Sequence, residues 1–507
     1  MKSAPAKYAI LFFACVLFHI LGTWALPLID RDEPRFAEAS REMIQRGDYV
    51  VPYFNNQLRL DKPPLTYWAQ VASYHIFGEN DFAARFPSAV AAALIAITIP
   101  FRGLRIGGER VGWRAAIIFT LCLQTFIHAK AAVADMWLAL FVSTAHWSGL
   151  ELLRDGLSGP PQERKSETQH GINLWWFCFY LSLALGFLAK GPIAWVPLLT
   201  VGSTIFYAPN LHLGRRFKFV RGTLLMLAII AAWGIPALVR TNGEFLRIGI
   251  GRHVIGRSLG AMEGHGWDSL GGYILLLPFY FLTVFVSFFP WSLKLPSLLN
   301  GLWNKRDNID RYLFYGIAII FIIFSLVKTK LPHYTLPAFG MLALLLARHW
   351  PEKTVSSVRT PLPATETRRS FFGRIAIATA CVWIAIALAV PPMVARFFPA
   401  YQLFQLSRGS LQPNMQFAAV EFQEPSLVWY FRSRVQGFLT PLKKRTAAEF
   451  MSAAGPRFIV LPTPVAGELF ATPPESWRFF TVSGFNIPKG KRVDLTLVLK
   501  PDDSLRR

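Results

Sequence analysis

Runs of about 20 apolar residues recur along this chain, and short connections rich in polar and basic residues separate them. A run of this length crosses the ~30 Å hydrocarbon core of a bilayer as an α-helix. The pattern predicts an α-helical polytopic membrane protein with about 11 to 13 transmembrane helices. The eleven clearest windows lie near residues 8–27, 84–101, 115–129, 132–151, 173–189, 192–208, 222–239, 271–293, 312–327, 334–347 and 375–393.

The composition excludes a soluble enzyme. Of the 507 residues, 53% are hydrophobic and 16% are charged, against roughly 25% charged in an ordinary soluble domain. The four cysteines all fall inside the apolar windows. This placement indicates packing residues and gives no sign of a disulfide framework or a cysteine zinc site.

The formal charge of +23 is explained by where the basic residues lie. If the N-terminus is cytoplasmic, the connections near residues 102–114, 215–221, 305–311 and 348–374 are basic and fall on the cytoplasmic side. Basic loops on one side are the positive-inside pattern of membrane proteins, so the charge does not indicate nucleic-acid binding. The same alternation places the long loop 28–80 and the C-terminal tail outside the cytoplasm.

The tail from about residue 397 differs from the rest of the chain, because its apolar runs shorten to five or six residues between turn signals. Strands are expected near 416–422, 458–461, 479–482 and 493–499, with helices near 426–431 and 446–453. We therefore expect two domains. These are a membrane domain over 1–396, with 28–80 as its outer catalytic loop, and a small α+β domain over 397–507.

Acidic and basic residues gather in the outer loop. The segment from Arg31 to Ile44 reads RDEPRFAEASREMI and predicts an amphipathic helix on the outer membrane surface, with Asp32 as its N-cap and an end at Gly47. A second motif, DKPPLTYW, runs from Asp61 to Trp68. Charged groups at the lipid boundary are costly unless they pair or bind a ligand, so both motifs indicate a site.

These motifs resemble the first outer loop of the GT-C glycosyltransferases of the protein O-mannosyltransferase and 4-amino-4-deoxy-L-arabinose lipid A transferase superfamily. Thinner matches follow at Ala134–Met136, at the LAKGP run of Leu188–Pro192, and at the KTKLPHY run of Lys328–Tyr334. The resemblance covers roughly residues 8–350. It implies a glycosyltransferase that uses a polyprenyl-phosphate-linked sugar on the outer side of a bacterial inner membrane and inverts the anomeric carbon.

The resemblance also implies roles for individual residues. An inverting displacement needs a carboxylate that takes the proton of the acceptor hydroxyl; Asp32 matches the family's loop acid, with Glu33 orienting it or the sugar. The leaving group is a lipid phosphate, which needs cations more than a general acid. The expected phosphate-binding residues are Lys62 first, followed by Arg257, Lys330, Tyr334 and Arg35.

Some relatives carry a metal beside the lysine of the second motif, so Asp61, His253 and His265 are candidate ligands for a zinc ion. Relatives usually have Glu at the position of Asp61. If no metal is bound, the two histidines are ordinary polar loop residues. Asp135 and Lys190 lie near outer helix ends, where an ion pair or a helix-end interaction is the simpler interpretation.

Two other functions are compatible with a polytopic chain of this kind. A transporter or flippase of lipid-linked sugars would place ionisable residues near mid-span, whereas here they cluster at outer helix ends. An inactive assembly subunit fits poorly with the retained Asp32, Glu33 and Lys62. The sequence leaves open both the sugar and the acceptor, which is lipid A, another envelope glycan or a protein.

Overall fold

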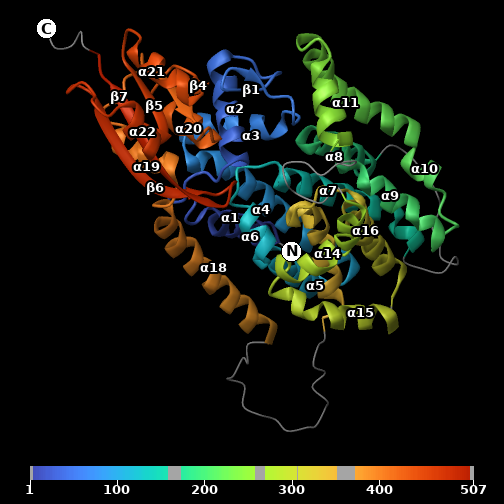
Figure 1. The fold of residues 1–507 in the computed structure, drawn as a ribbon. Coiled ribbons are helices and arrows are strands. Elements are labelled where there is room, and N and C mark those ends of the chain that lie inside the picture. The colour runs from blue at the N-terminus through green and yellow to red at the C-terminus, as the bar shows by residue number, and fades with distance from the viewer. Residues whose placement is uncertain (1–3, 158–172, 257–268, 305, 351–370, 503–507) are drawn as a thin grey trace. The chain divides into compact units, whose positions relative to one another are not determined.

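The computed structural model describes residues 4–157, 173–256, 269–304, 306–350 and 371–502 (Figure 1). It divides into two compact units. The first contains residues 1–20, 60–66 and 88–384, and the second contains residues 21–59, 67–87 and 385–507.

All regular elements among the described residues of the first unit are helices. Several of its helices are short or broken by 3-10 turns. Its elements are α1 (Ala4–Ile20), the greater part of α4 (Asp81–Ile106), α5 (Glu109–Leu121), α6 (Leu123–His128), α7 (Asp135–Leu157), α8 (Leu174–Lys190), η2 (Pro192–Trp195), α9 (Val196–Gly202), η3 (Ser203–Phe206), α10 (Leu213–Phe217), α11 (Phe219–Arg240), η4 (Leu246–Gly256), α13 (Leu270–Leu275), α14 (Phe279–Ser287), η5 (Trp291–Lys294), α15 (Leu295–Asn304), α16 (Asn308–Leu326), η6 (Pro332–Ala338), α17 (Phe339–Arg348) and most of α18 (Phe371–Ala395).

Four helices among the described residues are long and apolar enough to cross a membrane: 81–106, 213–240, 308–326 and 371–395. Each coincides with a predicted window. A fifth window, 271–293, falls partly on α14, which forms a pair bent by 116° with the helix that follows it. The remaining windows fall on shorter, broken or more polar helices.

Helix α11 lies close to α8, and a glycine makes this possible. A Cβ atom at Gly222 would lie 1.9 Å from the Tyr180 ring. The Tyr180 hydroxyl also donates a hydrogen bond to the Phe217 carbonyl at 3.0 Å, just before α11 begins. This contact sets how closely the two helices approach, and both contribute side chains to the pocket described below.

The second unit combines the outer loop with the tail. Its centre is a five-stranded sheet of order β4-β3-β5-β7-β6, in which β3 pairs in parallel with β4 and β5, while β7 runs antiparallel to β5 and β6. The elements of this unit are α2 (Asp32–Arg46), β1 (Tyr53–Phe54), β2 (Gln57–Leu58), most of α3 (Leu65–Phe77), α19 (Pro399–Ser407), β3 (Gln416–Val420), α20 (Pro425–Phe431), β4 (Leu439–Leu442), α21 (Lys444–Ser452), β5 (Arg457–Pro462), α22 (Thr463–Leu469), β6 (Arg478–Asn486) and β7 (Lys491–Lys500).

The tail confirms the four predicted strands and both predicted helices, and it adds β4, α19 and α22. β4 was missed because its sequence, LTPL, is short and contains a proline, which argues against a strand unless it lies at an edge. β4 is indeed an edge strand. The compact unit that holds this sheet also includes residues 21–59 and 67–87, so the domain division at residue 396 stays a prediction.

The helix after the first span begins and ends almost where the sequence predicts, but two expectations about it are wrong. Arg31, not Asp32, occupies the N-cap position, and no side chain caps the helix. Gly47 ends it, as expected, with a left-handed φ of 63°. Ten of its fifteen residues are buried, so α2 is a packed helix rather than one lying on the membrane surface. It packs against α20, because its polar residues find partners there.

Candidate active site

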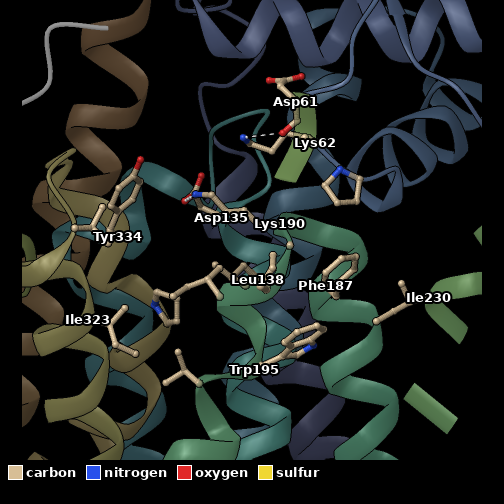
Figure 2. A pocket seen from close by; sticks show the side chains of 18 of the residues that line it. Asp61, Lys62, Asp135, Leu138, Phe187, Lys190, Trp195, Ile230, Ile323 and Tyr334 are labelled. Carbon is tan, nitrogen blue, oxygen red and sulfur yellow. Dashed lines mark hydrogen bonds and ion pairs between the residues drawn. The ribbon is translucent and has the colours of Figure 1, made fainter. Parts of the chain in front are cut away.

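A cavity of about 660 Å³ lies within the first unit and is amphipathic (Figure 2). Its polar residues gather at one end, whereas side chains such as Leu138, Phe187 and Trp195 form apolar walls further along. The polar residues are Asp61, Lys62, Asp135, Lys190, Thr329, His333 and Tyr334. A cavity of this kind suits a ligand with an anionic head and a hydrocarbon tail.

The ends of two helices supply the centre of the polar end. Asp135 begins α7 and Lys190 ends α8, and the Lys190 ammonium contacts the Asp135 carboxylate at 2.5 Å. Gly191 then turns the chain with a φ of +88°, and its N–H donates to the Phe187 carbonyl. Of the two interactions that the sequence left open, an ion pair is therefore present, and both of its residues line the cavity.

The second motif of the outer loop lines the same cavity. Asp61, Lys62 and Pro63 are wall residues, and the Lys62 ammonium donates to the Asp61 backbone carbonyl at 3.2 Å. Gly249 of η4 approaches the Leu60 backbone so closely that a Cβ atom there would lie 2.9 Å from the Leu60 carbonyl oxygen. The expected phosphate ligand Lys62 is therefore at the cavity's polar end.

The KTKLPHY run contains two expected phosphate ligands, Lys330 and Tyr334, and the structure gives them different surroundings. Tyr334 lines the cavity, with its ring 5.3 Å from the Lys190 ammonium. The Lys330 ammonium instead donates to the carbonyls of Phe324 and Ser325 and so satisfies the C-terminal end of α16. Burial lowers the pKa of Lys330 to about 8. These contacts give Lys330 a structural task that the sequence did not indicate.

The remaining candidates belong to the 241–269 loop. Arg257 and His265 lie outside the described residues, and His253 falls in η4 at a position whose side chain is not described. Of the expected zinc ligands, Asp61 alone is therefore located, at the cavity. The set of Asp61, His253 and His265 stays a prediction.

Asp32, Glu33 and Arg35 belong to the second unit. Asp32 is exposed, and within the described ranges no ion pair engages its carboxylate. Glu33 is buried and forms an ion pair with Arg85 at 2.6 Å, while Arg85 also donates to the carbonyls of Thr23 and Pro27. Glu33 thus holds the chain before α2 in place, and Asp32 presents its carboxylate to solvent.

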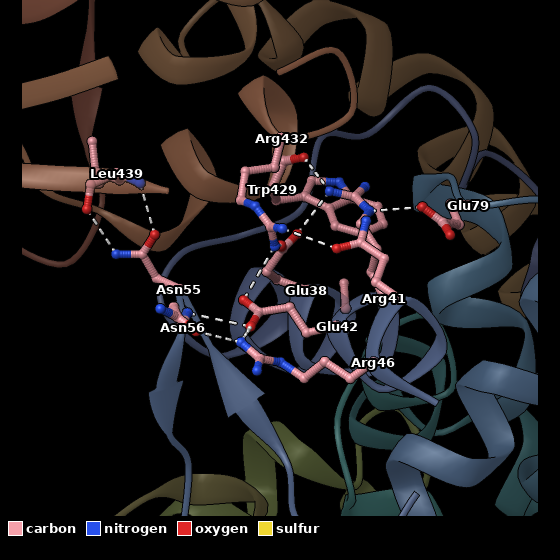
Figure 3. Close-up of polar contacts among 12 residues, drawn as sticks. Glu38, Arg41, Glu42, Arg46, Asn55, Asn56, Glu79, Trp429, Arg432 and Leu439 are labelled. Atoms are coloured by element: carbon pink, nitrogen blue, oxygen red, sulfur yellow. Dashed lines mark hydrogen bonds and ion pairs between the residues drawn. The ribbon is translucent and has the colours of Figure 1, made fainter. Parts of the chain in front are cut away.

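A buried ionic network fixes the rest of α2 (Figure 3). Glu38 accepts hydrogen bonds from Arg41 at 2.7 Å and from Arg432, which also lies 3.2 Å from Glu42. Arg41 donates to the Trp429 carbonyl and stacks on the Trp429 ring at 3.8 Å. Because these five residues come from α2 and from the α20 segment, the network ties the outer loop to the tail within this unit.

Asp30, just before α2, makes a similar link. Its carboxylate accepts hydrogen bonds from the Ser426 backbone N–H at 2.9 Å and from the Ser426 hydroxyl at 2.5 Å. Burial is the largest influence on this carboxyl and raises its pKa to about 7. The folded state therefore favours the protonated form of Asp30.

Sequence reasoning missed that Asp135, Lys190 and His333 share one cavity. His333 Nε2 lies 3.7 Å from the Asp135 carboxylate. The signal was present, since each of these residues stands at the edge of an apolar window. Residues at the ends of different helices meet only through the fold, however, so their shared position did not follow from spacing.

Comparisons with known proteins agree with this architecture. Residues 8–241 match the family model described as dolichyl-phosphate-mannose-protein mannosyltransferase. The chain is 31% identical over 346 residues to the undecaprenyl phosphate-alpha-4-amino-4-deoxy-L-arabinose arabinosyl transferase 2 of Sodalis glossinidius, covering 66% of this chain and 58% of the relative. For the corresponding transferase of Aeromonas salmonicida the identity is 32%, covering 67% of this chain and 59% of the relative.

The fold has a solved counterpart as well. The crystal structure of ArnT from Cupriavidus metallidurans bound to undecaprenyl phosphate superposes with a TM-score of 0.69 at 20% identity, covering 97% of this chain and 98% of that one. In sequence and in fold, this chain is similar to the GT-C glycosyltransferases. The relatives matched by sequence are aminoarabinose transferases, and the matched family model is that of a protein mannosyltransferase. The chain is an integral membrane protein with a small C-terminal sheet region. It spans less than two thirds of the length of the two transferases matched by sequence.

The network around Arg432 predicts that removing the Arg432 guanidinium strongly destabilises the folded protein. R432A leaves Glu38 and Glu42 buried without that guanidinium, which is expected to cost about 3–5 kcal/mol. R434A, at an exposed position two residues on, is expected to stay within about 0.5 kcal/mol of wild type. Thermal unfolding in detergent, with limited proteolysis of the tail, measures both. Equal unfolding midpoints for the two variants would contradict a stabilising network.

The pKa of Asp30 predicts a pH effect of definite sign. Because its folded pKa of about 7 exceeds the ordinary aspartate value of 3.8, its stabilising contribution is full below about pH 4 and is lost as the pH rises to about 7. Between pH 5 and 7.5 the free energy of unfolding of the wild type should fall by about 2 kcal/mol more than that of D30N. Unfolding midpoints at both pH values test this, with D155N as an exposed control. Parallel pH profiles for wild type and D30N would refute the raised pKa.

Proposed function

We propose that this protein transfers a sugar from a polyprenyl-phosphate-linked donor to an acceptor hydroxyl on the extracytoplasmic face of a bacterial inner membrane. The observation that carries the proposal is the amphipathic cavity, which joins a charged end to long apolar walls. A polyprenyl phosphate has the same division between an anionic head and a hydrocarbon chain. The Cupriavidus ArnT crystal structure has undecaprenyl phosphate bound, which supports this assignment.

The cations at the polar end fit the leaving group. When the acceptor oxygen attacks the anomeric carbon, the bond from that carbon to the phosphate oxygen breaks, and the lipid phosphate leaves with an additional negative charge. Lys62 and Lys190 line the cavity there, and Tyr334 can donate a hydrogen bond. Fixed cations and donors at the point where charge develops lower the barrier of such a step.

Asp32 is our proposed general base. It receives the proton that the acceptor hydroxyl loses as its oxygen bonds to the sugar, and attack from the face opposite the phosphate inverts the anomeric carbon. The match of the DEPRFAEASREM segment to the family's outer loop supports this role, as does the exposure of the Asp32 carboxylate. Glu33, which is engaged by Arg85, supports Asp32 by holding the helix start.

The names of the relatives indicate 4-amino-4-deoxy-L-arabinose as the first sugar to test. Lipid A, another envelope glycan and protein hydroxyls are the acceptors to compare. The extracytoplasmic orientation rests on the positive-inside distribution of basic connections. A flippase for the same lipid is the competing function, and it predicts donor binding without transfer.

The role of Asp32 predicts a specific loss of chemistry. D32N should reduce transfer by about 10²- to 10⁴-fold, the usual contribution of a general base, while expression and donor binding stay close to wild type. The helix should persist, because Asp32 does not cap it. The measurement is mass spectrometry of lipid A, polyprenyl lipids and envelope proteins from cells carrying each variant.

D48N is the matched control, since Asp48 lies in the same loop and accepts hydrogen bonds from the backbone N–H groups of Val50 and Val51. It should retain transfer. If D32N retains transfer as well, Asp32 is not the base. If wild type yields no sugar-modified product on any of the three acceptors but still binds the donor, the flippase function replaces the transferase.

The phosphate-binding role of Lys62 predicts weaker carrier binding. A charge-assisted contact to a phosphate is worth roughly 1.5–3 kcal/mol, so K62A should raise the dissociation constant for a short-chain polyprenyl phosphate by about 10- to 150-fold. R257A should weaken binding similarly, since both are proposed phosphate ligands. Titration of purified protein in nanodiscs measures the constants.

The control is K443A, at an exposed lysine of the tail, which should bind as wild type does. A preference of the wild type for polyprenyl phosphate over the matching alcohol is also required. Equal affinity of K62A and K443A, or no preference for the phosphate, would exclude the cavity's polar end as a phosphate site.

A further inference from the structure

Three potential metal ligands meet beside the cavity. His128 ends α6, Asp135 begins α7, and His333 lies in the 3-10 helix η6. One ligand atom from each lies within 4.8 Å of the others. Asp135 is buried and both histidines are half-buried. Asp135 and His333 also line the cavity, so the cluster is reached from it.

The two imidazole rings are held in position by their neighbours. Their centroids are 4.7 Å apart with the planes tilted by 37°. One turn before His128 on the same helix, the Gln124 amide lies 2.7 Å from His128 Nδ1. The Gln124 amide nitrogen also lies 3.5 Å from His128 Nε2, so this side chain contacts both nitrogens of the ring. Orientation of a ligating histidine through its other nitrogen is the usual arrangement in metal sites.

Asp135 is the shared member of the cluster. Its carboxylate pairs with the Lys190 ammonium at 2.5 Å, and His333 Nε2 lies 3.7 Å from the same carboxylate.

We infer that His128, Asp135 and His333 form a binding site for a zinc-class divalent cation. Two imidazoles and one carboxylate are a ligand set that zinc takes in proteins, whereas magnesium and calcium prefer oxygen ligands. Tetrahedral bonds of about 2.0–2.1 Å separate ligand atoms by ~3.3 Å, so side-chain rotation by about an ångström closes the set. The site has no ligand in common with the set of Asp61, His253 and His265 expected from the sequence.

Three protein ligands leave a tetrahedral cation one position, and the cavity is where a fourth ligand would enter. With Lys190 beside it, the filled cluster carries a net charge of about +2. An anionic oxygen is then the preferred fourth ligand. If the donor occupies the cavity as proposed above, its phosphate supplies this oxygen. That role rests on the proposed function, but the metal site itself does not.

Metal analysis without any lipid tests the site. Purified full-length protein is stripped with a chelator and titrated with Zn²⁺, and with Co²⁺ as a spectroscopic probe. Wild type should bind one zinc ion tightly and show the visible absorption of a cobalt site with nitrogen and oxygen ligands. H128Q and H333Q should each raise the zinc dissociation constant by at least about 10- to 100-fold. The exposed-histidine control H212Q should match wild type.

Unfolding midpoints of the stripped proteins show whether the variants fold, and a Zn²⁺-dependent rise in the midpoint of wild type that H333Q lacks supports the site independently. The inference is overturned if stripped wild type takes up no zinc. It is also overturned if H253Q and H265Q abolish binding while H128Q and H333Q keep it. Carrier titrations with and without Zn²⁺ then address the phosphate role: unchanged carrier affinity refutes that role and leaves the metal site standing.

Discussion

The structure depends on how ionised side chains are held where water is scarce. An isolated charge in a low-dielectric interior is costly, and it persists only with a partner of opposite charge and additional hydrogen bonds. In the first unit Asp135 and Lys190 satisfy one another at the end of two apolar helices. In the second unit Arg85 meets Glu33, and Arg41 meets Glu38. These pairs fix the cavity's polar end and the start of α2, the two places on which the proposed chemistry depends.

Much of the fold was predictable because hydrophobic periodicity is a local property. The long apolar windows gave the helices at 81–106, 308–326 and 371–395, and alternating patterns gave the strands of the tail. The missed strand β4 shows the limit of the method. Its four residues carry a proline and little pattern, and it exists because its parallel partner β3 supplies the hydrogen bonds.

The sequence identified residues of the candidate site only where they belong to short contiguous motifs. Lys62 and Tyr334 were named from such motifs, and both line the cavity. Lys330 was named from a motif in the same way. Its ammonium, however, donates to carbonyls at the end of α16, and the sequence does not show where that helix ends. His128 was not considered, because its nearness to His333 comes from two segments about 200 positions apart in the chain.

The interruptions in several predicted windows and the location of the site have one cause. Windows 115–129, 192–208 and 334–347 do not form single continuous helices; they break at Cys122 and into the 3-10 turns η2, η3 and η6. A broken helix leaves backbone groups unsatisfied, which a membrane protein tolerates only where the break is buried in protein or lines a cavity. At the break formed by η6, the side chains of His333 and Tyr334 line the cavity. Helix breaks make the hydropathy pattern harder to interpret. They are also the positions where a membrane protein can place polar residues of a site in its interior.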